Sequence, residues 1–237
     1  MKITILHLYY DLMNLYGENG NIKAMKNYLE QLGIKVNIVF STIGDELDLS
    51  NIDLIYIGSG TEQNQKVVLE HFIKYSKEIN NYIDENKFII STGNSFELFG
   101  QTIKYKDKKY DGLKIFDYNT LIEDFRMVDE IVAKSNFLNK PIIGFTNHNG
   151  VIKDSNKPLF NIIIGSGNYP KSIGDGFNKN NFYGTYIIGP ILARNPHLLT
   201  YLMNKLVKQK NSNFKIKKVN LNFENMAYDN YIKKYNI

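Results

Sequence analysis

The residues best placed for chemistry form a short polar turn, Ser91-Thr92-Gly93-Asn94-Ser95, which follows the apolar stretch 88–90. A sharp turn from a buried strand into a helix can hold a hydrolytic nucleophile, because small flanking residues let the reactive side chain stand clear of the sheet. The N-terminus of the following helix also stabilises a developing anion. This turn has small residues at both ends, but Gly93 lies at its centre. The sequence therefore predicts an elbow whose nucleophile position is empty.

Hydroxyl groups close to the elbow are the remaining nucleophile candidates. The chain contains no cysteine, which excludes disulfides and thiolate chemistry. Thr92 and Ser95 carry hydroxyls, yet each would need a base to become nucleophilic. His148 could be that base only if its loop reached the elbow, and we expect it to be a hydrogen-bonded structural residue. The other three histidines, His7, His71 and His197, are expected to be structural or exposed. The four histidines together show no metal-ligand spacing.

A second polar turn, Gly58-Ser59-Gly60, follows the apolar run 54–57. Backbone N–H groups in such a turn can hold an anion, as an oxyanion hole does. The alternative is a tight turn that needs glycine because φ is positive. Both interpretations remain open at this point.

The elements around these turns predict an α/β fold. In the first hundred residues, strand patterns at 2–8, 35–40, 54–57 and 88–90 alternate with helical patterns at 22–32, 63–83 and 96–99. This order is typical of a mostly parallel twisted sheet flanked by helices. In such sheets the functional groups gather at the carboxyl ends of the strands, where both polar turns lie.

The second half of the chain is richer in strand patterns. We expect strands at 103–105, 113–116, 129–133, 142–145, 160–164 and 182–188, and a helix at 196–208. No internal repeat or low-complexity linker divides the chain. We therefore expect a single domain over residues 1–210, and a C-terminal tail, 211–237, that forms a terminal helix packed by its tyrosines.

Composition limits the possible partners. The net charge is +5, and the lysines that cluster at 104–109 and 205–218 alternate with polar residues, so we expect a solvated surface and no nucleic-acid binding. No apolar stretch approaches the roughly 20 residues that cross a bilayer, and the N-terminal apolar run is too short for a signal peptide. These features predict a cytoplasmic protein without membrane insertion, metal or cofactor.

Four segments occur in an order and at a spacing found in one known family. They are 7–21 (HLYYDLMNLYGENGN), 58–65 (GSGTEQNQ), 144–150 (GFTNHNG) and 184–190 (GTYIIGP), the last followed by Asn195-Pro196. Over residues 5 to 205 the chain thereby resembles the CobB/CobQ-like class I glutamine amidotransferases. Within them it is most similar to the GatD type, the glutaminase subunits of lipid II isoglutaminyl synthase. The resemblance implies a flavodoxin-like class I glutamine amidotransferase fold.

The departures from this family fall on its catalytic positions. The family elbow is Cys-Gly-Gly-Tyr-Gln-x-x-Gly, and alignment on Gly100 puts Gly93 at the cysteine and Glu97 at the glutamine. Ile188 stands where the family has its catalytic histidine. Neither glycine nor isoleucine can attack a carbonyl or transfer a proton.

The resemblance also implies a set of substrate-binding residues. Arg126 matches an arginine associated with glutamine binding, and a planar guanidinium suits a carboxylate. The alternative for Arg126 is a surface arginine at the start of a strand. The remaining members of the implied glutamine site are Gly58, Ser59, Gly60 and Asn94.

The function implied is that of a GatD-like subunit that no longer hydrolyses glutamine. It would form a heterodimer with a Mur-ligase-like partner, which handles ATP and a peptidoglycan precursor. That partner would use free ammonia, or another glutaminase would supply it. One alternative is an active glutaminase with a non-cysteine nucleophile, and another is a stand-alone module that binds glutamine as a sensor. The sequence does not separate lipid II from a cobyrinate-type acceptor.

Overall fold

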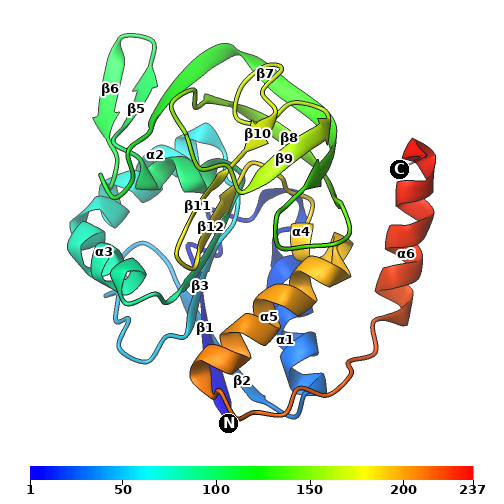
Figure 1. The fold of residues 1–237 in the computed structure, drawn as a ribbon. Helices are drawn as coiled ribbons and strands as arrows, with labels where there is room; N and C mark the ends of the chain where they lie inside the picture. Colours follow the sequence, from blue (N-terminus) through cyan, green and yellow to red (C-terminus); the bar gives the residue numbers. More distant parts are fainter. Residues whose placement is uncertain (237) are drawn as a thin grey trace.

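The computed structural model describes residues 1–236, which form two β-sheets with helices around them (Figure 1). Sheet A has the strand order β11-β12-β4-β3-β1-β2, and all its strands are parallel except β11. Its strands are β1 (Lys2–Leu8), β2 (Lys35–Ser41), β3 (Leu54–Ile57), β4 (Phe88–Thr92), β11 (Phe177–Lys179) and β12 (Phe182–Thr185). The central strands β3 and β4 are buried on both faces, which explains why their sequences are continuous apolar runs.

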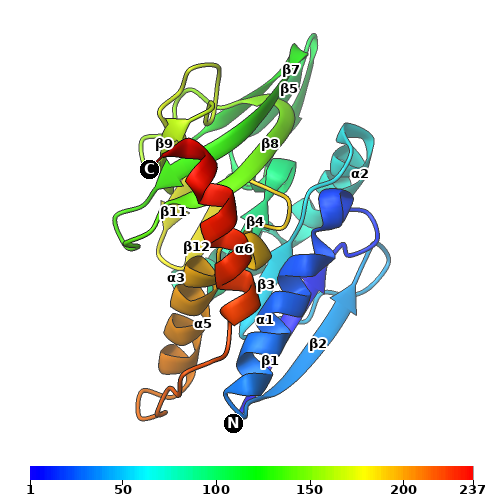
Figure 2. The ribbon, with the colours of Figure 1, turned by 90° about the vertical axis from the view of Figure 1, so that its right-hand side faces the viewer.

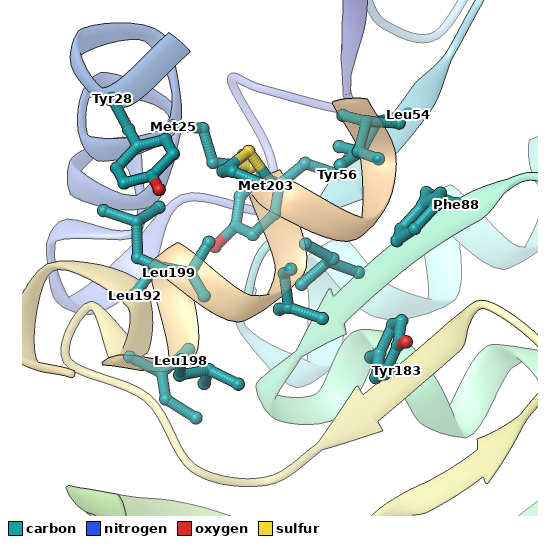
Figure 3. Packing of buried hydrophobic residues seen from close by; sticks show 14 of the residues in the cluster. Met25, Tyr28, Leu54, Tyr56, Phe88, Tyr183, Leu192, Leu198, Leu199 and Met203 are labelled. Carbon is teal, nitrogen blue, oxygen red and sulfur yellow. The ribbon is translucent and has the colours of Figure 1, made fainter. Parts of the chain in front are cut away.

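Helices cover both faces of sheet A. On one face, α1 (Asn19–Gln31), α4 (Ile191–Arg194) and α5 (Pro196–Lys210) pack on the sheet, as Figure 3 shows for Met25, Leu199 and Met203 against Tyr56. On the other face lie α2 (Glu62–Phe72), α3 (Ser76–Asp84) and a 3-10 helix, Gly93–Phe99. The predicted parallel sheet flanked by helices is therefore confirmed.

The second half of the chain forms a separate sheet B, which accounts for its predicted β-richness. Its path is β10-β9-β7-β5-β6, with β8 paired to β7, and most of its pairs are antiparallel. Its strands are β5 (Thr102–Tyr105), β6 (Lys108–Asp111), β7 (Asn119–Lys134), β8 (Ile142–Val151), β9 (Phe160–Ile164) and β10 (Gly174–Asp175).

Three sequence-based elements were wrong in detail. The helix expected at 63–83 is divided by a 3-10 turn, Ile73–Tyr75, because its apolar spacing continues through a change of direction. Residues 113–116 form no strand, since their N–H groups bond to carbonyls of the 3-10 helix and Gly100 instead of a neighbouring strand. The strand expected at 182–188 ends at Thr185, and Ile188 then makes an isolated backbone bridge to Phe145 of β8.

The C-terminal tail folds as α6 (Asn222–Ile232) and a 3-10 turn, Lys233–Tyr235, while residue 237 of the predicted tail lies outside the described residues. Tyr228 of α6 is buried, packs with Val132 and Ile143 of sheet B, and donates a 2.8 Å hydrogen bond to the Pro141 carbonyl. Figure 2 shows α6 (red) outside the layer of α1 and α5. Within residues 1–236, no helix has both the length and the apolar character needed to cross a bilayer.

One buried amide joins the two halves of the fold. Asn195 is fully buried between α4 and α5, and its Oδ1 accepts a hydrogen bond from the Ile143 N–H at 2.8 Å. Its Nδ2 donates to the carbonyls of Ile143 at 2.7 Å and Ile191 at 2.8 Å. The side chain therefore satisfies backbone groups of β8 that no neighbouring strand pairs.

We predict that Asn195→Ala lowers the free energy of unfolding by about 2–4 kcal/mol, because it leaves buried backbone groups without partners. Urea unfolding followed by circular dichroism measures this loss. Asn51→Ala is the matched control, since that exposed amide contacts only the Ser50 hydroxyl, and it should change stability by less than about 0.5 kcal/mol. Equal losses of unfolding free energy in the two variants would contradict the role of Asn195 as the partner of buried backbone groups.

Candidate functional site: a filled elbow after β4

The elbow after β4 is real, and its centre is closed by side chains from two other segments. Gly93 has φ of +64°, which a residue without Cβ adopts at little cost. A Cβ built on Gly93 would overlap the Oγ and Cβ of Ser59 and would lie 3.2 Å from Cγ2 of Ile188. Ser59 is 2% exposed and Ile188 fully buried. The structure thus brings positions 93 and 188 together, with Ser59 in the space that a side chain at position 93 would use.

The turn Gly58-Ser59-Gly60 needs its glycines because the backbone of another segment lies too close to leave room for a Cβ. A Cβ on Gly58 would lie 2.5 Å from the Met13 carbonyl oxygen, and one on Gly60 would lie 2.9 Å from that of Leu12. Neither glycine has positive φ, so the interpretation as a left-handed tight turn is wrong. The turn is instead pressed against the segment before α1, whose Leu15 N–H donates to the Ser59 carbonyl at 2.9 Å.

The Gly60 N–H, which this turn could offer to an anion, is already hydrogen-bonded to the side chain of Asn94. Its Oδ1 accepts hydrogen bonds from the Gly60 N–H at 2.9 Å and from Ser59 Oγ at 3.4 Å. Its backbone carbonyl accepts from Gln65 Nε2 at 2.7 Å. A substrate oxygen would therefore have to displace an amide that is only 8% exposed.

Glu18 is a buried acid beside the elbow that the sequence did not single out. Its carboxyl accepts hydrogen bonds from the hydroxyls of Thr92 and Tyr56 and, at 3.4 Å, from the Gly189 N–H. Burial raises the pKa of Glu18 to about 7, against the opposing effect of these hydrogen bonds. The only signal in the sequence was an acidic residue inside the 7–21 segment.

The two hydroxyl candidates are held in different environments. Ser95 Oγ is fully buried, 2.7 Å from Ser91 Oγ and within hydrogen-bond distance of the Ile57 and Thr92 carbonyls, with no basic side chain among these partners. Thr92 does have an acid–base partner, Glu18, but both side chains are fully buried. Of the two, only Thr92 has a group that could accept its proton.

Glu97 lies in a second buried polar cluster. Its carboxyl accepts from Gln65 Nε2 at 2.7 Å and from the Tyr186 hydroxyl at 2.9 Å, and Tyr105 donates to Gln65 Oε1 at 2.6 Å. Burial raises the pKa of Glu97 to about 7 despite these donors.

His148 belongs to this second cluster, and within residues 1–236 no hydrogen bond joins it to the hydroxyls of Thr92 or Ser95. Its ring stacks on Tyr186 with a centroid separation of 3.6 Å, and its Nδ1 lies 2.8 Å from the Gly150 carbonyl. Burial lowers its pKa to about 4, so the ring is neutral at physiological pH. His148 is therefore held as a packed, hydrogen-bonded residue.

The other three histidines lie in aromatic surroundings. His7 packs among the rings of Tyr56 and Phe40, His71 contacts Tyr9, and His197 contacts Tyr228.

Arg126 lies at the rim of the site. Its guanidinium pairs with the carboxylate of Glu62, the first residue of α2, and donates to Asn147 Oδ1 at 2.9 Å. Its side chain is 40% exposed. The structure thus places Arg126 against Glu62, which lies two residues beyond the Gly58-Ser59-Gly60 turn, with its guanidinium already bound to a carboxylate.

This arrangement, with a parallel sheet, a sharp turn after β4 and a glycine turn after β3, is that of the class I glutamine amidotransferases. A glutamine amidotransferase from Thermotoga maritima shares the fold with a TM-score of 0.53 at 9% identity, and the match covers 99% of this chain and 92% of that one. The sequence model of the CobB/CobQ-like glutamine amidotransferase domain matches residues 4–196, and the chain belongs to this family.

Two bacterial relatives agree with this assignment. The chain is 31% identical over 213 residues to the GatD subunit of lipid II isoglutaminyl synthase (glutamine-hydrolyzing) from Streptococcus pneumoniae, covering 88% of this chain and 82% of the relative. It is 27% identical over 219 residues to the corresponding Staphylococcus aureus subunit, covering 92% and 90%. The family resemblance inferred from the four segments is confirmed.

We predict that Gly93→Ala destabilises the protein by about 2–4 kcal/mol, because the new Cβ adds both left-handed strain and overlap with Ser59. The double variant Ser59→Gly/Gly93→Ala should lack the overlap and regain the stability that the overlap costs. In a double-mutant cycle measured by urea unfolding, this corresponds to a coupling energy of about 1–3 kcal/mol between the two positions.

Gly17→Ala is the matched control for strain alone, since Gly17 has φ of +78° and no atom within 4 Å of a built Cβ. It should cost about 1 kcal/mol. Additive effects of the changes at positions 59 and 93 would show that Ser59 does not fill the space beside Gly93.

We further predict that Glu97→Gln makes the protein more stable than wild type at pH 8, and that this advantage disappears near pH 4. The folded-state pKa of Glu97 is raised from 4.5 to about 7, so the wild type loses stability as pH rises through this interval. The difference should approach about 3 kcal/mol. A glutamine can keep both partners, because its oxygen accepts from Gln65 and its NH₂ donates to the Tyr186 hydroxyl.

Urea unfolding of both proteins at pH 4, 6 and 8 tests this. Glu18 and Asp175, whose pKa values burial also raises to about 7, contribute equally to both proteins and cancel in the difference. Glu70→Gln, at an exposed position of α2, should show no such trend. A stability difference that is constant with pH would contradict the buried, neutral state of Glu97.

Proposed function

We propose that this chain is a GatD-like subunit that does not hydrolyse glutamine and that forms a heterodimer with a Mur-ligase-like subunit to amidate lipid II in the cytoplasm. The relatives, both named as GatD subunits of lipid II isoglutaminyl synthase, support a role in lipid II amidation. The observation that carries the loss of hydrolysis is the packing of Ser59 and Ile188 over Gly93.

Hydrolysis of glutamine needs a nucleophile, a proton carrier and an anion site. Position 93 offers no side chain, and Ile188 cannot move a proton. The Gly60 N–H is bonded to Asn94. Loss of a nucleophile or of its base reduces hydrolytic rates by about 10⁴–10⁶. Because the space is also filled, a substrate carbonyl has no position from which to react.

In the proposed heterodimer the partner carries the ATP-dependent chemistry and uses free ammonia as its nitrogen source. This chain contributes a folded subunit without cofactor or metal. Glutamine binding would require its carboxylate to displace Glu62 from Arg126, which disfavours the sensor alternative.

One observation favours a different function. The Thr92 hydroxyl lies against the Glu18 carboxyl, and a pKa near 7 would let that carboxylate accept a proton at physiological pH. This pair is the strongest candidate for a non-cysteine nucleophile. The burial of both side chains argues against it, since glutamine cannot reach them without movement of the surrounding turns.

We predict that the purified heterodimer amidates lipid II with ammonium and ATP, but not with glutamine and ATP. Release of glutamate from glutamine should lie at least about 10⁴-fold below that of the Streptococcus pneumoniae GatD complex under the same conditions. Mass spectrometry of lipid II and a glutamate assay measure the two reactions.

Thr92→Ala/Ser95→Ala is the control variant for this comparison. Glutamate release by the wild type above the level of this double variant would establish the rival glutaminase. Failure of ammonium to support amidation would reject the proposed role in lipid II amidation.

A further inference from the structure

The C-terminal helix α6 has apolar side chains on two opposite faces. Tyr228, Tyr231 and Ile232 lie on the face that packs against sheet B. Phe223 and Met226, on the other face, are 85% and 61% exposed. Figure 1 shows α6 (red) at the outer edge of the molecule. A helix that stabilises only its own fold needs one apolar face, so the second face requires another explanation.

The exposed face forms a continuous stripe. Residues three and four apart are neighbours on a helix surface, so Phe223, Met226, Ala227 and Asn230 lie on one side of α6. All four are exposed. A large aromatic and a methionine at this spacing are typical of a helix that fits into an apolar groove of another protein.

A hollow adjoins this stripe at the first turn of α6. It has a volume of about 310 Å³ and opens between α1, α4, α5 and α6, with Glu224, the neighbour of Phe223, in its wall. Its apolar wall is formed by Ala24, Ala193, Leu199 and Leu221. The hollow can receive a side chain from a protein seated on the stripe.

Basic side chains predominate around this surface, although Glu224 lines the hollow. Lys215, Lys217 and Lys218, on the segment that leads into α6, are exposed, as is Lys23 beside the hollow. Among residues 1–236 none of these four lysines is ion-paired, whereas Asp229 of α6 is neutralised by Lys140. Two copies of this chain would bring these lysines together, so the surface does not suit self-association.

We propose that the α6 stripe and the adjoining hollow form the docking surface for the Mur-ligase-like subunit, which would present an apolar groove with an acidic rim. This inference rests on the proposed function, and it names the part of the chain that holds the partner. The apolar stripe provides the contact that slows dissociation, and the lysines accelerate association.

The test is the affinity of the purified full-length chain for the purified Mur-ligase-like subunit, measured by calorimetry, for the wild type and for Phe223→Glu/Met226→Glu. The dissociation constant should rise at least tenfold in this double variant. Lys217→Glu/Lys218→Glu should lower the association rate, measured by surface plasmon resonance, and weaken its dependence on salt. Val67→Glu, at an exposed apolar position on α2, is the matched control and should leave affinity unchanged.

Each result distinguishes this inference from the proposed function. Unchanged affinity in Phe223→Glu/Met226→Glu, with an unchanged urea midpoint, overturns the docking surface but leaves the heterodimer. Absence of binding by the wild type rejects the heterodimer itself. A homodimer of the wild type that dissociates in the same variant, detected by light scattering, would identify a second copy as the occupant and overturn the inference.

Discussion

The space beside the Cα of Gly93 controls the architecture of this site. Ser59 fills it from the β3 turn, and Ile188 closes it from the segment after β12. The β3 turn can lie this close to the elbow only because position 93 has no Cβ, and this approach brings the Gly60 N–H to Asn94. The space beside Gly93 is therefore a packed interior rather than an empty pocket. Close packing of this kind makes positions 59, 93 and 188 interdependent.

Two buried carboxyls connect the elements around this packed interior by hydrogen bonds. Glu18 links the start of α1 to β3, β4 and Gly189, and Glu97 links the elbow helix to α2 and Tyr186. Within residues 1–236 neither carboxyl has a cationic partner. Burial therefore keeps their pKa values near 7, and the hydroxyl and amide donors satisfy their oxygens. Such fully bonded networks specify one arrangement of the surrounding elements. This explains how the elbow keeps its geometry although no reaction depends on it in the proposed function.

The local features of this fold could be predicted from sequence, whereas the contacts between distant turns could not. Five strands of sheet A, all except β11, followed from apolar runs. Motifs in register singled out Gly93 and Ile188, which the structure places close together. The contact of Ser59 with Gly93 depends on how two turns approach in space, and no pattern along the chain encodes that distance. The same limit applies to Glu18, whose burial arises from Tyr56, Thr92 and Gly189. Residues 113–116 looked like a strand because apolar spacing does not distinguish pairing with a strand from packing on a 3-10 helix.

The packed site around Gly93 and the helix α6 both contact strand β8, but at different residues. Phe145 of β8 pairs with Ile188 at the site, while Ile143 lies under Tyr228 and is bonded by Asn195. The family match ends at residue 196, before α6 begins, so the exposed stripe of α6 lies outside the common domain, whereas the hollow beside it is walled partly by α1 and α4. Substitutions at positions 93 and 188 alter buried contacts, and the exposed face of α6 does not take part in them. The proposed loss of glutamine chemistry therefore leaves the proposed docking surface intact, because the two depend on different residues held by the same scaffold.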